Sequence, residues 1–373
     1  MHAPRKVPFF NYPHIFTHDE KGFLEVITGV GRRGAFIMQK DLSDFEKRLA
    51  AFTGARYALG VANATDGLQM ALMAGGIKAG DEVLFCSHTM IATASAIHFA
   101  GGVPVPVETG PDHLMDPTKL ERHITPRTRA IMPTQLNGRV ANMDAIQAIA
   151  DKHGLQVYED AAQALGAKYK GRCAGTFGVG ACISFYPAKV LGCLGDGGAV
   201  LCNDDAVYQK LYMLRDHGRS EQTGEVEMWG FNSRLDNLQA ALLNYQLDHF
   251  PQVIERRRQV ARIYQERLGS LKQLVLPPAP GSEPDHFDVF QNYEIEAERR
   301  DELKRFLADR GVGTLIQWGG KAVHQFGAAL GFDQSLPVTE RMFKSMIMLP
   351  MNMSQTDDDV AYVCDCIREF YHA

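Results

Sequence analysis

Short apolar runs alternate with amphipathic stretches across the first two thirds of this chain. The runs have the length of buried strands, whereas stretches 68–72 and 143–150 space their apolar residues as one face of a helix. This alternation predicts an α/β fold with a mostly parallel central sheet flanked by helices, and such sheets bind ligands outside the carboxyl ends of their strands. The expected strands are Tyr57–Ala62, Glu82–Cys86, Val103–Val107, Ala130–Pro133, Gln156–Tyr158, Cys182–Phe185 and Ala199–Cys202.

The last third of the chain has a different pattern. One long helical region is expected from Ser233 to about Leu268, and the charged run 255–258 within it is more typical of a solvated helix face than of a binding patch. A Pro-rich stretch follows. Because 373 residues exceed one simple core, we predict a large domain over 14–247 and a smaller α+β domain over 248–373, with the N-terminal arm 1–13 packed nearby.

Composition narrows the range of partners. The chain is 45% hydrophobic, and its net charge of −5 is spread without a basic stripe for nucleic acid or a lysine-rich tail for a membrane surface. It has no apolar signal core and no run approaching the ~18 apolar residues of a membrane span. Seven cysteines scattered through apolar runs indicate buried thiols in a reducing compartment, and the spacing of Cys364 and Cys366 does not suit zinc. We expect a cytoplasmic protein that acts on small molecules and binds no metal.

Two charged residues lie close behind expected strands. Asp160 follows the strand 156–158, and Lys189 follows the apolar run 182–185. A buried carboxylate can hold a pyridine nitrogen protonated, and a lysine can condense with an aldehyde and later carry a proton. The segment between them has room for a surface excursion at 168–172 and a return strand, so both side chains can reach one edge of the sheet. Either residue alone is more simply a capping aspartate or a solvated lysine, but together they indicate a pyridoxal 5'-phosphate (PLP) site.

A phosphate site is also indicated. The strand ending at Ala62 continues into Asn63-Ala64-Thr65-Asp66-Gly67 and then a helix. Small and hydroxyl residues at a helix start present N–H groups and a hydroxyl to an anion, although an ordinary N-cap explains the same residues equally well. Ser184 offers a second hydroxyl, or is a plain strand serine.

A further glycine-rich segment suggests another class of enzyme. Gly29-Val30-Gly31-Arg32-Arg33-Gly34 satisfies the dinucleotide fingerprint letter for letter. It follows apolar residues spaced as a helix face, and no acidic residue ends a second strand about 20 residues later. An NAD-dependent oxidoreductase is therefore the weaker alternative.

Seven segments occur in the order typical of the DegT/StrS family of sugar aminotransferases, which the chain resembles over roughly residues 20–370. They are Asn63-Ala64-Thr65-Asp66, Gly80-Asp81-Glu82-Val83, Ala92-Thr93-Ala94, Glu159-Asp160-Ala161-Ala162-Gln163, Ser184-Phe185-Tyr186-Pro187-Ala188-Lys189, Gly195-Asp196-Gly197-Gly198 and Phe231-Asn232-Ser233-Arg234-Leu235-Asp236. The resemblance implies the fold type I, aspartate aminotransferase-like fold of PLP-dependent transferases. It also implies transfer of an amino group, usually from L-glutamate, to a ketone on a nucleotide-linked sugar. Dehydrating relatives typically replace the lysine with histidine, so Lys189 favours transamination.

The same resemblance implies roles for individual residues. PLP would be held as an imine on Lys189, with Asp160 at the pyridine nitrogen and Gln163 at the ring hydroxyl. The phosphate would be bound by Ala64, Thr65 and Ser184, and by Asn232 from the other subunit of a homodimer with shared active sites.

The chain departs from the family at three places. Where family members often carry Ser-Gly-Thr it has Asn63-Ala64-Thr65, and we expect phosphate binding to survive because the N–H of Ala64 remains. After Ser87 the family usually has an aromatic residue that stacks on the cofactor, and we expect His88 to take that place because imidazole can stack. On the acceptor side, Trp318 is expected to stack on sugar or base, Lys321 to meet a phosphate and His324 to complete the pocket, although a core tryptophan and a surface lysine are equally simple. The acceptor therefore stays open to a keto-cyclitol, and a PLP-binding regulator without turnover is a further alternative.

Overall fold

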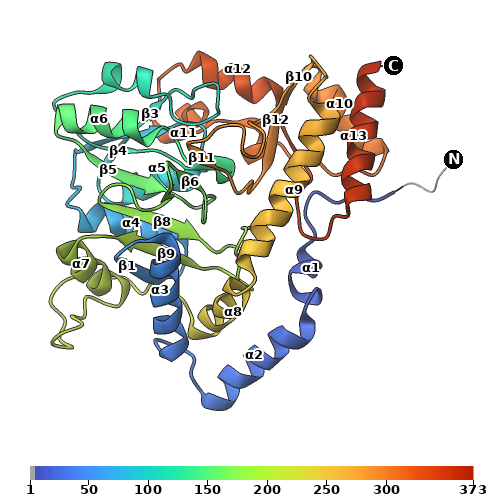
Figure 1. Ribbon diagram of the computed structural model, residues 1–373. Helices are drawn as coiled ribbons and strands as arrows, with labels where there is room; N and C mark the ends of the chain where they lie inside the picture. Colours follow the sequence, from blue (N-terminus) through green and yellow to red (C-terminus); the bar gives the residue numbers. More distant parts are fainter. Residues whose placement is uncertain (1–4, 373) are drawn as a thin grey trace.

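The computed structural model describes residues 5–372, and its centre is a seven-stranded sheet (Figure 1) in the order β1-β9-β8-β5-β4-β2-β3. β9 runs antiparallel to both neighbours, and the other pairings in this sheet are parallel. The predicted mostly parallel sheet is confirmed, and each predicted strand is present with its ends moved by two residues or fewer. The strands are β1 (Tyr57–Val61), β2 (Glu82–Cys86), β3 (Val103–Val107), β4 (Thr128–Met132), β5 (Gln156–Asp160), β8 (Gly180–Ser184) and β9 (Gly198–Cys202).

Apolar side chains cover both faces of this sheet. On β2, Leu84 and Cys86 join one hydrophobic core while Val83 and Phe85 join the other, because successive side chains of a strand point to opposite faces. Each core also receives the apolar faces of helices, and the first core takes the start of α9 (Phe250–Leu268) in addition to those named next. The first core takes α3 (Lys40–Thr53), α6 (Met143–His153) and α8 (Asn237–Leu247), and the second takes α4 (Ala64–Ala74), α5 (Ile91–Phe99) and α7 (Asp205–Arg215).

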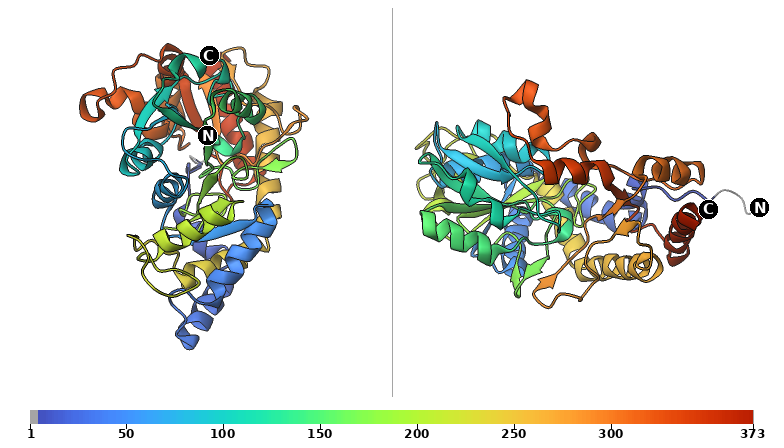
Figure 2. Two further views of the ribbon diagram at one scale, coloured as in Figure 1. Left: turned by 90° about the vertical axis from the view of Figure 1, so that its left-hand side faces the viewer. Right: turned by 90° about the horizontal axis from the view of Figure 1, so that it is seen from above.

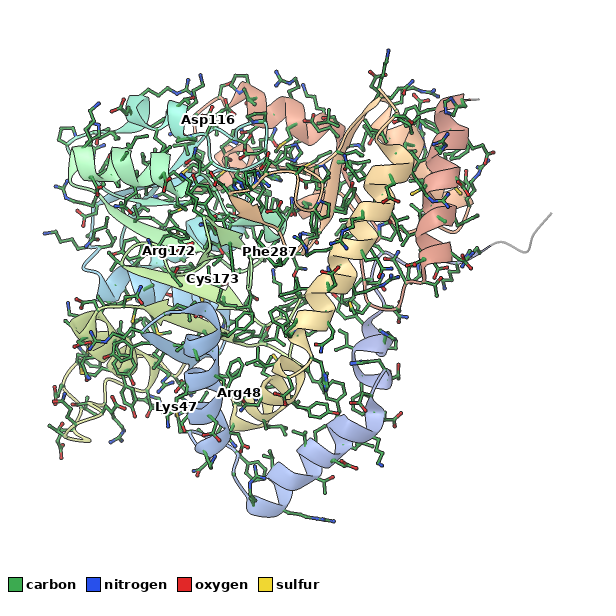
Figure 3. The ribbon with its side chains drawn as sticks, viewed as in Figure 1. Lys47, Arg48, Asp116, Arg172, Cys173 and Phe287 are labelled. Carbon is green, nitrogen blue, oxygen red and sulfur yellow. The ribbon has the colours of Figure 1, made fainter. Side chains whose placement is uncertain are left out.

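A small hairpin leaves the sheet between β5 and β8, at the surface excursion expected for 168–172. It consists of β6 (Lys168–Tyr169) and β7 (Arg172–Cys173) and pairs with β11 (His286–Phe287). Figure 3 labels Arg172, Cys173 and Phe287 on the outer strands of this hairpin sheet. β8 then returns parallel to β5, so the carboxyl ends of the two strands lie at the same edge.

Another antiparallel sheet, called the small sheet below, forms the C-terminal region. It contains β10 (Leu274–Val275), β12 (Tyr293–Ala297) and β13 (Met346–Leu349). The helices α9 (Phe250–Leu268), α10 (Arg300–Asp309) and α13 (Asp357–His372) share a core with it, and from above they form a group beside the large sheet (Figure 2). The remaining helices here are α11 (Gly327–Leu330) and α12 (Pro337–Ser345).

The single helix expected from Ser233 to about Leu268 is wrong. α8 ends at Leu247, and α9 begins at Phe250 with Pro251 in its first turn. Proline is tolerated there because the first N–H groups of a helix have no intrahelical acceptor. The proline therefore marks a helix start in the middle of the predicted one.

α9 belongs to both regions of the molecule. Phe250 and Ile254 pack in the first core of the large sheet, whereas Val260 and Tyr264 pack in the core of the small sheet. The helix thus runs from one core into the other (Figure 1). The domain division between residues 247 and 248 stays a prediction.

The N-terminal segment carries α1 (Tyr12–Thr17) and α2 (Glu20–Arg33). Residues 1–4 of the predicted arm lie outside the described residues, and Val7 forms a bridge with Val312 and packs in the core of the small sheet. The segment Gly29–Gly34 lies in the last turns of α2, and Gly34 ends that helix with a φ of 62°. It is a helix C-terminus and not a strand-to-helix turn, so the geometry does not support a dinucleotide site there.

Candidate active site

A cavity of about 750 Å³ lies at the carboxyl edge of the large sheet, at the ends of β5 and β8 and the start of α4. Parallel α/β sheets bind ligands at this edge. The structure brings seven of the predicted site residues together on the cavity wall. They are Ala64, Thr65, Asp160, Gln163, Ser184, Lys189 and Trp318.

Pairing of β5 with β8 fixes the two reactive groups. Asp160 is the last residue of β5 and lies opposite Cys182. Lys189 lies five residues beyond β8, in a turn where its N–H donates to the carbonyl oxygen of Tyr186 (2.8 Å). The lysine therefore comes from the loop after the strand, and this loop carries it to the same cavity as Asp160.

Asp160 is a buried carboxylate held by neutral donors. Thr93 donates to its Oδ2 (2.6 Å) and the N–H of Ala162 to its Oδ1 (3.2 Å). Behind Thr93, the hydroxyls of Thr89 and Thr134 continue the chain at 2.7 and 3.0 Å. Burial raises the pKa of Asp160, and these hydrogen bonds together with the charge of Lys189 only partly offset it. A protonated ring nitrogen would supply the missing cation, so the site fits a pyridine cofactor.

The environment of Lys189 increases the share of the neutral amine. Burial lowers the pKa of Lys189 from 10.5 to about 8, against the opposing charge of Asp160. A lysine becomes a nucleophile when its amine loses its proton, so this shift prepares it for attack on a carbonyl.

The orientation of the Gln163 amide is determined by its neighbours. Its Oε1 accepts from the backbone N–H of Asn137 (3.0 Å) and from Nδ2 of Asn292 (3.1 Å). Because a backbone N–H can only donate, the atom facing it must be the oxygen. The NH₂ group is then the free end of the side chain, available to an acceptor in the cavity.

The start of α4 has the features of an anion site. Asn63 caps the helix through Oδ1, which accepts from the N–H of Asp66 (2.9 Å). Ala64 and Thr65 follow as the first helical residues, whose N–H groups lack intrahelical acceptors. Gly198 lies directly beneath, where an added Cβ would come within 2.8 Å of the Ala64 nitrogen. That glycine lets β9 approach the helix start.

The structure places Met90, and not His88, on the cavity wall. His88 is fully buried, contacts the carbonyl oxygen of His113 through Nδ1 (3.0 Å), and lies edge-on to Trp318 and Phe343. Met90 lines the cavity and is 53% exposed. His88 is thus in the polar layer behind the wall, and its expected stacking on the cofactor is corrected. Met90 immediately precedes α5, the position in the sequence that could have identified it.

Three other predicted residues lie off this wall. Lys321 is exposed, with its Nζ 5.9 Å from the ring centre of Phe326. His324 is buried between Ser87 (2.7 Å from Nδ1) and Glu340 (3.3 Å from Nε2), and burial lowers its pKa. Asn232 is exposed on the segment that follows α7 and does not line the cavity of its own subunit. Sequence reasoning missed Arg257, Gln291 and Asn292, which do line it.

Comparison with known proteins gives consistent matches. The chain matches the DegT/DnrJ/EryC1/StrS aminotransferase family over residues 17–368. It is 40% identical to the dTDP-3-amino-3,4,6-trideoxy-alpha-D-glucose transaminase of Streptomyces venezuelae, over 98% of this chain and 96% of that one. It is 37% identical to a pleiotropic regulatory protein of Geobacillus stearothermophilus, over 98% of both. Among solved structures, S. venezuelae DesV in complex with a ketimine intermediate is similar over the full length of both chains, with a TM-score of 0.94 and 38% identity.

Proposed function

Since the chain belongs to the DegT/DnrJ/EryC1/StrS aminotransferase family and is a PLP-dependent aminotransferase, we propose that it transfers an amino group from L-glutamate to the keto group of a nucleotide-linked sugar. The reaction serves amino-sugar biosynthesis. The observation that carries the proposal is one cavity that holds Asp160, Lys189 and the start of α4. The similarity to a dTDP-amino-sugar transaminase supports the choice of acceptor.

The residues of the cavity fit the cofactor. PLP, when bound, supplies an electron sink for the carbon that exchanges its amino group. With PLP bound, Asp160 would keep the ring nitrogen protonated, and the NH₂ group of Gln163 would donate to the ring oxygen. The N–H groups at the start of α4 and the hydroxyls of Thr65 and Ser184 would bind the phosphate. Lys189 would hold the cofactor covalently and, as a free amine, would carry the proton.

The acceptor side is formed by the C-terminal region. Trp318 lines the cavity and offers an aromatic face to a sugar or base. Gln317 reaches the same wall, where its Nε2 donates to Asn137 (2.9 Å) and to Glu294 (2.8 Å). A keto-cyclitol has the same hydroxyl-rich ring chemistry and is the second candidate acceptor.

The enzyme acts as a homodimer with shared active sites. Two apolar side chains on the segment after α7 are far more exposed than is usual, Trp229 at 97% and Val226 at 60%. Large exposed apolar side chains mark interaction surfaces, and Asn232 on this segment reaches the partner's phosphate site.

We also propose a cytoplasmic location. The seven cysteines are free and buried, which suits a reducing compartment. No helix within residues 5–372 has both the length and the apolar character required to cross a membrane.

A spectroscopic titration tests the function. PLP is added to the purified protein, and the visible spectrum is recorded before and after L-glutamate and then after a panel of keto-sugar nucleotides with product detection by mass. An aminotransferase shows a cofactor band that glutamate converts and a keto-sugar nucleotide restores. A regulator shows a band that glutamate leaves unchanged, and an oxidoreductase shows no band. Restoration by a keto-cyclitol alone would replace the sugar as acceptor.

A further inference from the structure

Arg257 departs from the solvated helix face expected for residues 255–258. It is 3% exposed, and the neighbouring Arg258 is 7% exposed. Arg257 follows Phe250 and Ile254 at the 3–4-residue spacing of the buried face of α9. A charged side chain thus occupies the helix face that packs into the molecule.

This buried guanidinium has no carboxylate partner within residues 5–372. Its three hydrogen bonds run from Nη1 to the carbonyl oxygens of Phe290 (2.9 Å), Gln291 (3.0 Å) and Met351 (3.3 Å). Its Nε atom is buried and has no hydrogen-bond partner within residues 5–372. Burial alone shifts its pKa, to about 10, so the side chain still carries its charge at neutral pH.

Two other buried arginines of the protein are neutralised by carboxylates, and Arg258, which has no ion pair among the described residues, donates to the carbonyl oxygen of Asp288 (2.7 Å) and lies over the ring of Phe287. Arg215, 2% exposed, pairs with Glu46, and Arg139, 9% exposed, pairs with Asp288 (2.6 Å) and Glu283. Buried charges are normally paired because desolvation is costly. A buried guanidinium that has neither a carboxylate nor an aromatic ring against it is therefore a candidate to receive its anion from a ligand.

Arg257 also lines the cavity of the reactive lysine. It lines the 750 Å³ cavity that contains Lys189. Behind the loop that carries Lys189 is a second cavity of about 550 Å³, and Lys189 and Arg257, together with Phe10, line both cavities. The two cationic side chains thus share the wall between them.

We propose that Arg257 binds a carboxylate of the amino-acid donor, an inference that rests on the proposed transamination. Nε and Nη2 form the side of the guanidinium that Nη1 leaves free, and a planar carboxylate matches this two-nitrogen edge. The phosphate of the cofactor belongs at the start of α4, which has its own N–H donors. Arg257 thereby selects an amino acid over an amine that has no carboxylate.

Binding of glutarate tests the inference without turnover. Glutarate has the two carboxylates of glutamate and no amino group. We expect the Arg257→Gln variant of the PLP-loaded enzyme to bind it about 10-fold to 100-fold more weakly in calorimetry, because charge-assisted hydrogen bonds are lost. Arg258→Gln is the matched control, since Arg258 is equally buried on the same helix but stacks on Phe287 (4.2 Å), and it should retain wild-type affinity. Unchanged affinity in Arg257→Gln would overturn the inference.

A second readout separates binding from general damage. Methoxyamine attacks the cofactor carbonyl carbon without needing a carboxylate, so its reaction rate, followed by absorbance, should be the same in Arg257→Gln and wild type. Equal losses with methoxyamine and L-glutamate would mean that Arg257 acts on the fold or the cofactor. Inorganic phosphate serves as competitor, and equal loss of phosphate and glutarate binding would make this a phosphate site instead.

Two measurements keep the test valid if Arg257→Gln does not fold. Arg257→Lys keeps the charge and can donate to the three carbonyl oxygens but lacks the fork, so it should bind glutarate more weakly than wild type. A crystal structure of the wild type with glutarate should show a carboxylate within hydrogen-bond distance of Arg257, and glutarate bound elsewhere would refute the assignment. If L-glutamate converts the wild-type cofactor band but Arg257→Gln and Arg257→Lys bind glutarate normally, the role of Arg257 is wrong and the proposed function is unaffected. If glutarate binding depends on Arg257 but L-glutamate does not convert the band, the proposed function is wrong and the carboxylate site is unaffected.

Discussion

Two clusters of buried charge in this protein have opposite electrostatics. Around Glu294 on β12, partners overcome burial: His113 (2.8 Å), Asn137 (3.2 Å) and Gln317 (2.8 Å) donate to it. Against burial, His88 (3.6 Å) and His113 hold the pKa of Glu294 well below its usual range, and Glu294 and Glu296 in turn raise the pKa of His113 to about 10.

In the cavity, burial wins. The pKa of Asp160 is raised and that of Lys189 is lowered to about 8, so each group is shifted toward its neutral form. Glu294 has its partners within the fold, whereas the charged groups of the cavity would find theirs on a cofactor and a substrate. In these two clusters the shifts therefore run in opposite directions, toward the charged forms of Glu294 and His113 and toward the neutral forms of Asp160 and Lys189.

The largest effect is expected for Lys189→Ala. The lysine is both the covalent anchor and the proton carrier, so turnover should fall by at least about a thousandfold and the absorbance of the covalently held cofactor should be lost. The fold should stay intact by circular dichroism. Lys168→Ala, on the exposed hairpin, should behave as wild type, and comparable transamination by Lys189→Ala would exclude this lysine from the reaction.

Glu294→Gln should break the complete cluster. Removing one partner of a buried ion pair leaves His113 with less compensation, and we expect a loss of about 3 kcal/mol in the free energy of unfolding, measured with urea. Glu302→Gln, at an exposed position on α10, should leave that free energy unchanged. Wild-type stability in Glu294→Gln would mean that the cluster does not stabilise the fold.

Asp160→Asn should give the opposite combination. The amide cannot keep the ring nitrogen protonated, so activity should fall about a hundredfold while the cofactor is retained. The apoprotein should melt at the same temperature or higher, because a carboxylate that burial disfavours has been removed. Wild-type turnover would exclude Asp160 from the site.

The Glu294 cluster also predicts that the free energy of unfolding depends on pH. His113 has a folded pKa of about 10, above its ordinary value of 6.5. Its stabilising contribution is fully present below pH 6.5 and is lost as the pH rises toward 10, with a slope of at most about 1.4 kcal/mol per pH unit. Urea unfolding at several pH values should show this slope, and His113→Asn should remove it. Wild-type protein without such a decline would contradict charged pairing of His113 with Glu294 and Glu296.

Mixing subunits tests whether Asn232 of one subunit completes the phosphate site of the other. An inactive Asn232 variant and inactive Lys189→Ala are allowed to exchange subunits. A heterodimer then has one site with both defects and one with neither, so up to about half of the activity per dimer should return. No recovery despite confirmed exchange would show that Asn232 serves its own subunit or only the local fold.

The seven strands were predictable because their apolar runs have strand length and because successive side chains join both cores, as on β2. Asp160 and Ser184 were placed by their positions at the ends of β5 and β8, Lys189 by its position after β8, and Gln163 by the family resemblance. His88 was misplaced because it and Met90 are only two positions apart in the loop between β2 and α5. Which of them lies on the cavity wall depends on where α5 begins, and the sequence did not show that this is at Ile91.

Residues far apart in the sequence were harder to place. Lys321 and His324 follow Trp318, whose φ of 48° turns the chain away from a regular path, so spacing alone could not locate them. Arg257 was discoverable: it follows Phe250 and Ile254 at the apolar spacing of α9. Its charge obscured that signal, because charged residues are almost never buried without a partner.

The helix α9 also bears on how the molecule unfolds. One helix of 19 residues, about 28 Å long, inserts side chains into the core beneath the large sheet and into the core of the small sheet. Neither core can lose its packing without exposing apolar surface of the other. The two sheets are thus bound into one cooperative unit, and heat or denaturant should melt them in a single transition in spite of their separate cores.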